Sequence, residues 1–200
     1  MLSGPLVFVD VDTQRDFMEP SGALYVPGAD SIVSNLKRLT DFARSRRIPI
    51  LATACAHTPD EPDPEPFPPH CLIGTKGQQR IAATAWTGSG GQVLGLDQVN
   101  DLEALPPHLT LHKNRYDVFT HKSADAVIAR YGAINPRFVV YGVATDYCVK
   151  AAIDGLLDRG QKVALVTDAI KAIDGSAEEG LLAGWAERGV SLVRTDAVVG

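Results

Sequence analysis

The chain has 200 residues, a formal net charge of −5, 45% hydrophobic residues and 22% charged residues, a balance typical of one globular domain. The basic residues are spread along the sequence, which argues against a nucleic-acid-binding face. No stretch approaches the roughly 18 apolar residues that cross a bilayer, and the apolar start lacks the basic leader of a signal peptide. We therefore expect one cytoplasmic domain over 1–200, with neither a membrane nor a nucleic-acid partner.

Strands and helices are predicted to alternate along the chain. The run Leu6-Val7-Phe8-Val9 has no polar alternation, which indicates a strand over 5–11 that is buried on both faces. Apolar residues three and four positions apart predict a helix over 29–46, with Asp30 as its cap. Ser176 and Glu179 form a capping-box pattern before another helix. The remaining predicted strands are 48–54, 109–113, 137–141, 162–167 and 191–194, and the remaining predicted helices are 123–131, 146–159 and 176–188.

Six strands alternating with helices predict an α/β fold, in which a doubly wound, six-stranded parallel sheet carries helices on both faces. In such a sheet, ligands bind beyond the carboxyl ends of the strands. Two segments lie outside the alternation. Six prolines among acidic residues in 58–69 predict a long, stiff loop of a functional kind. The Gly-rich segment 82–100 reads as irregular, with a short strand around Val93.

Cys148 follows a predicted strand and begins a predicted helix. The free N–H groups and the positive dipole end of a helix N-terminus lower the pKa of a thiol and can hold an oxyanion. A small, inert cysteine packed under the helix is the alternative. The chain has three cysteines, Cys55, Cys71 and Cys148. An odd number without a secretory leader predicts reduced thiols.

Asp12 and Lys113 also lie at predicted strand ends. A carboxylate at Asp12 could take the thiol proton and return it to a leaving amine, although Asp10 and Asp16 compete for this role. A cation at Lys113 would stabilise both a carboxylate and a thiolate. Taken singly, Asp12 is better explained as a loop carboxylate that caps a turn, and Lys113 as a solvated lysine at a strand end. The coincidence of three such side chains at strand ends favours an enzyme with Cys148 as nucleophile.

Three segments then resemble a known family. They are Gly-Val-Ala-Thr-Asp-Tyr-Cys-Val at 142–149, Asp-Thr-Gln-Arg-Asp-Phe at 12–17, and Phe-Pro-Pro-His-Cys at 67–71 followed by Gly-Thr-Lys-Gly at 74–77. The chain resembles the isochorismatase-like cysteine hydrolases, most closely their nicotinamidase branch. The resemblance implies a catalytic triad of Asp12, Lys113 and Cys148. It also implies a cis peptide between Val143 and Ala144, and an oxyanion hole formed by the N–H groups of Ala144 and Cys148. True isochorismatases lack the nucleophilic cysteine.

The resemblance further implies hydrolysis of nicotinamide to nicotinate and ammonia through a thioester, as in NAD salvage. Phe17 and Phe67 are expected to line the pocket and stack on the substrate ring, and Tyr147 is expected to bind substrate as well. We expect a homo-oligomer that acts on a small-molecule amide, without an organic cofactor.

Nicotinamidases also bind a divalent metal through Asp-x-His, a second His and the His before Cys. Here Cys55 stands in place of the Asp, His57 and His70 are kept, and the middle His is missing. Counting from His57, Asp63 is the first choice for the third ligand, with Asp60 and Glu65 as alternatives and Cys55 as a fourth ligand. Such a set favours zinc, then iron or manganese. Alternatively, the acids only keep an exposed loop soluble.

Two other functions stay open. One is a metal-free hydrolase of another small amide or carbamoyl compound. The other is a non-catalytic nucleotide- or ligand-binding module. The absence of Gly-x-Gly-x-x-Gly after the first strand, and of a phosphate-binding loop, disfavours the module.

Overall fold

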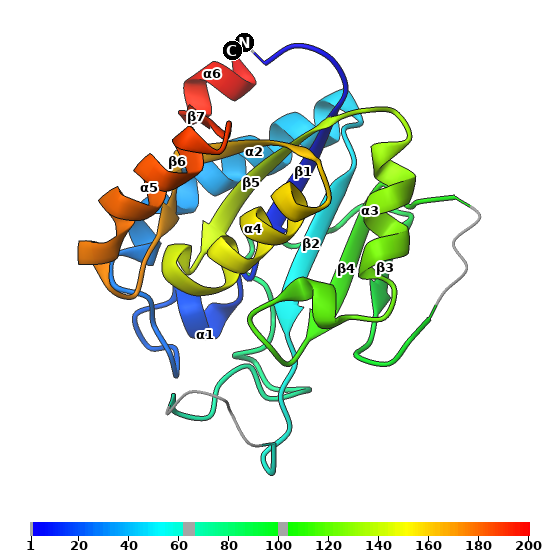
Figure 1. Ribbon diagram of the computed structural model, residues 1–200. Coiled ribbons are helices and arrows are strands. Elements are labelled where there is room, and N and C mark those ends of the chain that lie inside the picture. Colours follow the sequence, from blue (N-terminus) through cyan, green and yellow to red (C-terminus); the bar gives the residue numbers. More distant parts are fainter. Residues whose placement is uncertain (1, 62–66, 100–103) are drawn as a thin grey trace.

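The structure is a computed structural model that describes residues 2–61, 67–99 and 104–200 (Figure 1). A parallel sheet crosses the molecule, and the two chain termini lie side by side at one end. No helix in these ranges is long and apolar enough to cross a membrane.

The sheet has seven strands in the order β3-β4-β2-β1-β5-β6-β7, and every neighbouring pair is parallel. The central strands are buried along almost their whole length, as continuous apolar runs require when helices cover both faces. Their bounds are β1 Leu6–Val11, β2 Ile50–Cys55, β3 Gly91–Leu94, β4 His108–Lys113, β5 Arg137–Val143, β6 Lys162–Lys171 and β7 Ser191–Val193.

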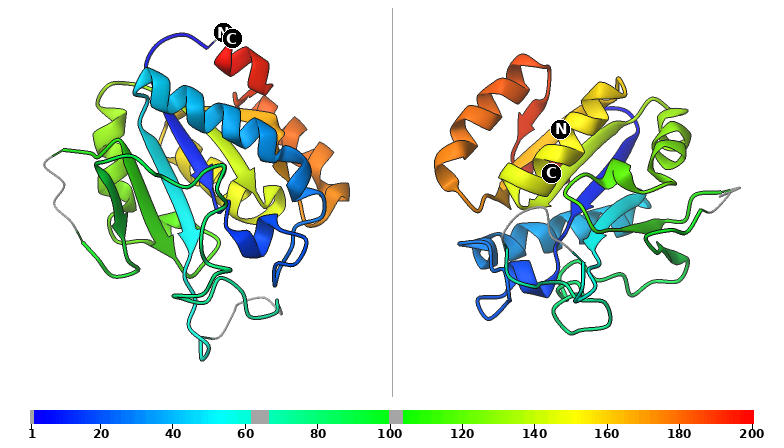
Figure 2. Two further views of the ribbon diagram at one scale, coloured as in Figure 1. Left: turned by 180° about the vertical axis from the view of Figure 1, so that it is seen from behind. Right: turned by 60° about the horizontal axis from the view of Figure 1, so that its bottom comes forward.

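Helices cover the two faces of the sheet in two groups (Figures 1 and 2). On one face, α3, α4 and α5 pack against residues such as Val7 and Val9 of β1. On the other face, α1, α2 and α6 pack against Phe8 of the same strand. Their bounds are α1 Arg15–Met18, α2 Val33–Arg46, α3 Ala124–Gly132, α4 Lys150–Asp158, α5 Glu178–Glu187 and α6 Thr195–Val199. The alternation of side chains along each strand therefore supplies one core layer to each group of helices.

The expected fold class is confirmed, with differences in detail. The sheet has a seventh strand, β3, because the short run around Val93 pairs with the edge of β4. The proposed capping box is wrong: Asp174 accepts the Ser176 N–H, and α5 begins later, at Glu178. Asp30 does not cap its helix, since its carboxylate bonds the Tyr25 hydroxyl instead.

Candidate active site

Asp12 lies where the chain leaves β1. Its φ of 49° places it in the left-handed region, which Asp tolerates better than most residues. The Thr53 hydroxyl donates to one carboxylate oxygen of Asp12 at 2.6 Å, which fixes the side chain. Gly142 of the neighbouring strand is required beside this turn, because a Cβ there would lie 2.1 Å from the Val11 carbonyl oxygen. The close approach of β5 to β1 therefore sets the position of Asp12.

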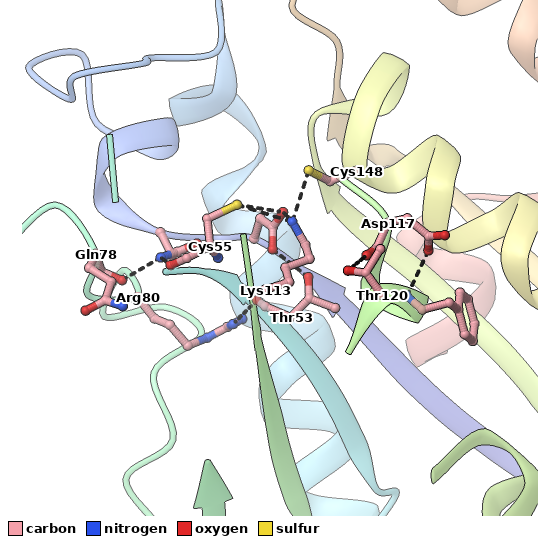
Figure 3. Close-up of polar contacts among 11 residues, drawn as sticks. Thr53, Cys55, Gln78, Arg80, Lys113, Asp117, Thr120 and Cys148 are labelled. Carbon is pink, nitrogen blue, oxygen red and sulfur yellow. Dashed lines mark hydrogen bonds and ion pairs between the residues drawn. The ribbon is translucent and has the colours of Figure 1, made fainter. Parts of the chain in front are cut away.

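Lys113, the last residue of β4, is the centre of the site (Figure 3). Its ammonium nitrogen lies 2.7 Å from an Asp12 carboxylate oxygen, 3.3 Å from Cys148 Sγ and 3.2 Å from Cys55 Sγ. Lys113 is 2% exposed, and a buried cation of this kind requires anionic partners. Asp12, Lys113 and Cys148 are thus brought together as the strand-end positions suggested, although their catalytic roles stay predictions.

Cys148 lies in a π-helical turn, η3 (Thr145–Val149), that precedes α4. The Val149 N–H reaches back to the Ala144 carbonyl oxygen at 3.0 Å, the bond that defines this wide turn. The peptide bond between Val143 and Ala144 is cis, as the resemblance implies. Ala144 and Cys148 both line the same pocket, and the oxyanion hole formed by their N–H groups stays a prediction.

The thiols of Cys55 and Cys148, which both contact Lys113, ionise as a coupled pair. Their mutual interaction lowers the pKa of Cys55 well below its usual range, and Lys113 contributes to the same shift. The same interaction, together with burial, raises the pKa of Cys148 well above its usual range. The expectation of a lowered pKa at Cys148 is therefore not met, because burial and the neighbouring Cys55 outweigh the helix N-terminus. Because the two thiols share one proton, the two pKa values describe the Cys55–Cys148 pair and not the separate residues.

The other two charged groups of the site have shifted pKa values as well. Burial raises the pKa of the Asp12 carboxyl, the Cys55 charge adds to this, and Lys113 opposes it. Burial by itself would lower the pKa of Lys113, but the charges of Asp12, Cys148 and Cys55 reverse the effect and raise it well above its usual range. The carboxyl is therefore a stronger base than an exposed Asp, and the lysine stays charged.

Asp10 and Asp16, the rival carboxylates, have structural partners elsewhere. Asp10 forms an ion pair with Arg80 and accepts the Thr13 hydroxyl at 3.0 Å. Asp16 accepts the backbone N–H of Cys71 at 2.7 Å. A Cβ at Gly77 would lie 2.2 Å from the Asp16 carboxylate, which explains the second glycine of the 74–77 segment.

The pocket above the thiols has aromatic walls and a polar rim. It encloses a space of about 460 Å³, open solvent at its mouth included. Phe17, Phe67 and Tyr147 line it as expected, and the rings of Phe67 and Tyr147 meet edge to face at 5.3 Å. Cys55 and Cys148 both reach this space. Aromatic side chains of this kind favour stacking with a planar ring.

The candidate metal ligands only partly match the expectation. Ligand atoms of Cys55, His57 and His70 lie within 4.8 Å of one another, and all three residues are buried. The Nδ1 atom of His70 lies 2.9 Å from the Pro68 carbonyl oxygen, and His57 Nδ1 faces Glu61 at 3.5 Å. A second partner on Nδ1 fixes a ring for coordination through Nε2. Asp60 is exposed. Asp63 and Glu65 lie outside the described residues.

Sequence reasoning missed four residues around the pocket. Asn114, Arg115 and Tyr116 line it directly, since they follow the end of β4. Glu61 lies behind them, bonded to the Asn114 amide and 3.8 Å from an Arg115 guanidinium nitrogen. The position of residues 114–116 directly after a predicted strand could have identified them as pocket residues. No pattern in the sequence indicates Glu61, because only the folded loop brings it to His57.

The parallel sheet and the cysteine site at its strand ends together define a cysteine hydrolase with a doubly wound α/β fold. The family model of the isochorismatase domain matches residues 6–197, and the chain belongs to this family.

Among its relatives, the nicotinamidase of Escherichia coli K12 is 28% identical, and the match covers 85% of this chain and 84% of the relative. A pyrazinamidase of Pyrococcus horikoshii, solved in complex with zinc, is 28% identical with a TM-score of 0.75, covering 94% of this chain and 98% of that one. An N-carbamoylsarcosine amidase of Thermoplasma acidophilum, 22% identical over 96% of this chain and 97% of its own, shares the fold with a TM-score of 0.75.

Proposed function

We propose that the protein hydrolyses the carboxamide of a small planar substrate, nicotinamide first, to a carboxylate and ammonia. One observation carries the proposal: the Lys113 ammonium contacts both Asp12 and Cys148 at the floor of an aromatic pocket. A thiol, a base and a cation in mutual contact are the requirements of nucleophilic amide hydrolysis. The relatives named above, a nicotinamidase and a pyrazinamidase, support the same reaction class.

In the proposed reaction Asp12 accepts the proton of Cys148, and the thiolate attacks the amide carbon. The raised pKa of Asp12 suits this transfer, since a carboxyl whose pKa lies nearer neutrality is the stronger base. Lys113 compensates the negative charge during the transfer. The N–H groups of Ala144 and Cys148 bind the oxyanion. Asp12 then protonates the amino group of the intermediate, so the C–N bond breaks, ammonia leaves and a thioester remains on Cys148. Water cleaves this thioester, which releases the carboxylate and restores Cys148.

The pocket walls support an aromatic substrate. Phe17, Phe67 and Tyr147 would stack on a six-membered ring, and Tyr116 would border it on the side of β4. If nicotinamide is the substrate, the reaction serves pyridine nucleotide salvage. The homo-oligomeric state and the cytoplasmic location expected from the sequence form part of this proposal.

We also propose a divalent metal held by Cys55, His57 and His70. One thiolate and two imidazoles with fixed rings form a donor set that fits zinc better than magnesium or calcium. When bound, the metal would supply a Lewis-acid contact to the ring nitrogen of the substrate. Glu61 would orient His57 through Nδ1.

Ammonia release tests the proposed function. The panel would contain nicotinamide, pyrazinamide, benzamide and an N-carbamoyl amino acid, each measured with and without a chelator. We expect nicotinamide and pyrazinamide, which both carry a ring nitrogen meta to the carboxamide, to react fastest, and the Cys148→Ala variant to release no ammonia. Release only from the carbamoyl compound, unaffected by chelator, would favour the metal-free hydrolase. No release from any amide would contradict the proposal and favour the non-catalytic module.

Cobalt substitution tests the metal site without reference to activity. A Co²⁺-loaded protein with a thiolate ligand shows a near-ultraviolet charge-transfer band, which Cys55→Ser should abolish. Cys71→Ser is the matched control, because Cys71 is a buried thiol outside the proposed ligand set. Failure of the protein to bind cobalt or zinc would remove the metal from the proposal and leave the hydrolase intact.

A further inference from the structure

A second thiol lies beside the proposed nucleophile, and the amidase reaction gives it no covalent role. Cys55 and Cys148 approach the Lys113 ammonium to 3.2 and 3.3 Å, and their sulfur atoms lie within 4.8 Å of each other (Figure 3). Both line the pocket, at 4% and 8% exposure, so a small solute in the pocket reaches both sulfurs. Cys55 is the register partner of Lys113 in the β2–β4 pair, so the sheet itself fixes the contact.

We propose that Cys55 and Cys148 form a redox-modification site, which a small peroxide converts into a reversible Cys55–Cys148 disulfide. The inference goes beyond the proposed amidase function and does not depend on it. The two sulfurs lie within 4.8 Å of each other and both face the pocket, where a small peroxide can oxidise one of them. The second thiol is then close enough to react before further oxidation.

The reaction balances in two steps. The thiolate attacks hydrogen peroxide, so the O–O bond breaks, an S–O bond forms, and hydroxide leaves and takes up a proton to become water. The second thiol loses its proton and attacks the sulfenic sulfur, so the S–S bond forms, the S–O bond breaks, and a second water leaves. Overall, two thiols and one peroxide give one disulfide and two waters. The sulfurs are oxidised by two electrons, and the peroxide is reduced.

Closure requires the sulfurs to approach from within 4.8 Å to a bond of about 2 Å, a movement of roughly 3 Å at most. Cys55 is the fixed partner. The Gln14 side chain accepts its backbone N–H at 2.7 Å and donates to its carbonyl oxygen at 2.8 Å. Cys148 is the partner that would move, because it lies in the π-helical turn η3, whose i+5 bond is wider than that of an α-helix.

Cys71 offers a control within the same chain. It is also a buried free thiol, but it is not among the residues that line the pocket. A site defined by Lys113 and the pocket should therefore exclude Cys71.

Peroxide treatment of the chelator-treated, full-length protein tests the proposal. After oxidation, free thiols are alkylated and the unreduced digest is mapped by mass spectrometry. We expect free thiols to fall from the three cysteines of the chain to one. A Cys55–Cys148 peptide should appear that dithiothreitol removes, and Cys71→Ser should give the same cross-link. In Cys55→Ser, Cys148 should instead proceed to the sulfinic acid, which dithiothreitol does not reverse.

Two results would overturn the site. One is wild-type protein in which Cys148 reaches the sulfinic acid without a cross-link, and the other is a cross-link that involves Cys71. The wild-type map needs no variant to fold, and thiol counts and peptide masses are independent of turnover. A negative result here therefore leaves the amidase proposal untouched, and a missing amidase activity leaves this test valid.

Discussion

Two cations near the ends of β1 and β2, the half-buried Arg80 and the buried Lys113, have different surroundings. Arg80 donates to the Thr53 carbonyl oxygen at 3.1 Å and to the Thr13 hydroxyl at 2.7 Å, and it pairs with Asp10. Lys113 instead contacts Asp12 and two thiols. Neither Asp10 nor Arg80 lines the pocket, whereas both thiols do.

The difference shows what separates a structural ion pair from a reactive one. A planar guanidinium holds its N–H donors in fixed directions. The hydrogen bonds of Arg80 therefore fix loop 72–81 against the end of strand β1, and its ion pair has little conformational freedom. An ammonium is a point charge that several groups can share. Around Lys113 a proton can therefore move between a carboxyl and two thiols while the cation remains in place. The predictions below change one group at a time, from the largest expected effect to the smallest.

Removal of the proposed nucleophile should have the largest effect. Cys148→Ala should reduce amide turnover by roughly 10³-fold or more, because no other group forms the proposed thioester. Only one sulfur that faces the pocket is lost, so the free energy of unfolding should change by about 1 kcal/mol or less. Steady-state ammonia release and urea unfolding measure the two effects. Retention of a tenth of the turnover would contradict the nucleophile assignment.

Asp12→Asn and Asp10→Asn separate the two carboxylates. Asp12→Asn removes the proposed base, so turnover should fall by about 10²–10⁴-fold. Asp10→Asn leaves Arg80 buried without its counter-charge, so stability should fall by about 3 kcal/mol while folded molecules keep most of their turnover. Turnover per folded molecule and denaturant midpoints measure both variants. Equal turnover losses would show that the distinction between the two cations is wrong.

Lys113→Ala tests the shared cation. Without the ammonium the thiolate is less favoured, so the pH at which iodoacetamide alkylation is half-maximal should rise by about one unit or more. Arg80→Ala serves as the comparison and should leave the alkylation profile unchanged in the folded protein. An alkylation pH profile of Lys113→Ala that matches the wild-type profile would contradict the electrostatic role of Lys113.

His108, which stacks on Trp86 at the opposite end of β4, should give the smallest effect. Burial, then the charges of Arg80 and Arg44, lower its pKa from 6.5 to about 3. The unfolded chain therefore binds this proton first, and stability is lost as pH falls below about 6.5. The loss should approach roughly 1.4 kcal/mol per pH unit.

Urea unfolding of wild type and His108→Gln between pH 6.5 and 5 separates the contribution of His108 from that of other groups. The difference in unfolding free energy between the two proteins should shrink by roughly 1.4 kcal/mol per pH unit. A difference that stays constant over this range would show that His108 titrates normally in the folded state.

Much of the fold was predictable because its central strands are continuous apolar runs, which only a covered parallel sheet accommodates. The short helix α1 and the edge strand β3 were not predicted with their bounds, since four residues carry little periodicity. Asp12, Lys113 and Cys148 could be grouped from the sequence, because functional residues in such a sheet lie beyond the carboxyl ends of the strands. The contact of Cys55 with Lys113 was missed because it requires the spatial order of β2 and β4, which the chain order does not give.

Mass spectrometry of the enzyme during nicotinamide turnover tests the central claim most directly. Rapid acid quenching should trap a nicotinoyl thioester, and digestion should place it on the peptide that contains Cys148. The Cys55→Ser variant should form the same adduct, since it keeps Cys148, the proposed nucleophile, in the pocket. A nicotinoyl group on Cys55, or ammonia release from the Cys148→Ala variant with an adduct elsewhere, would contradict the assignment of Cys148 as the nucleophile of this site.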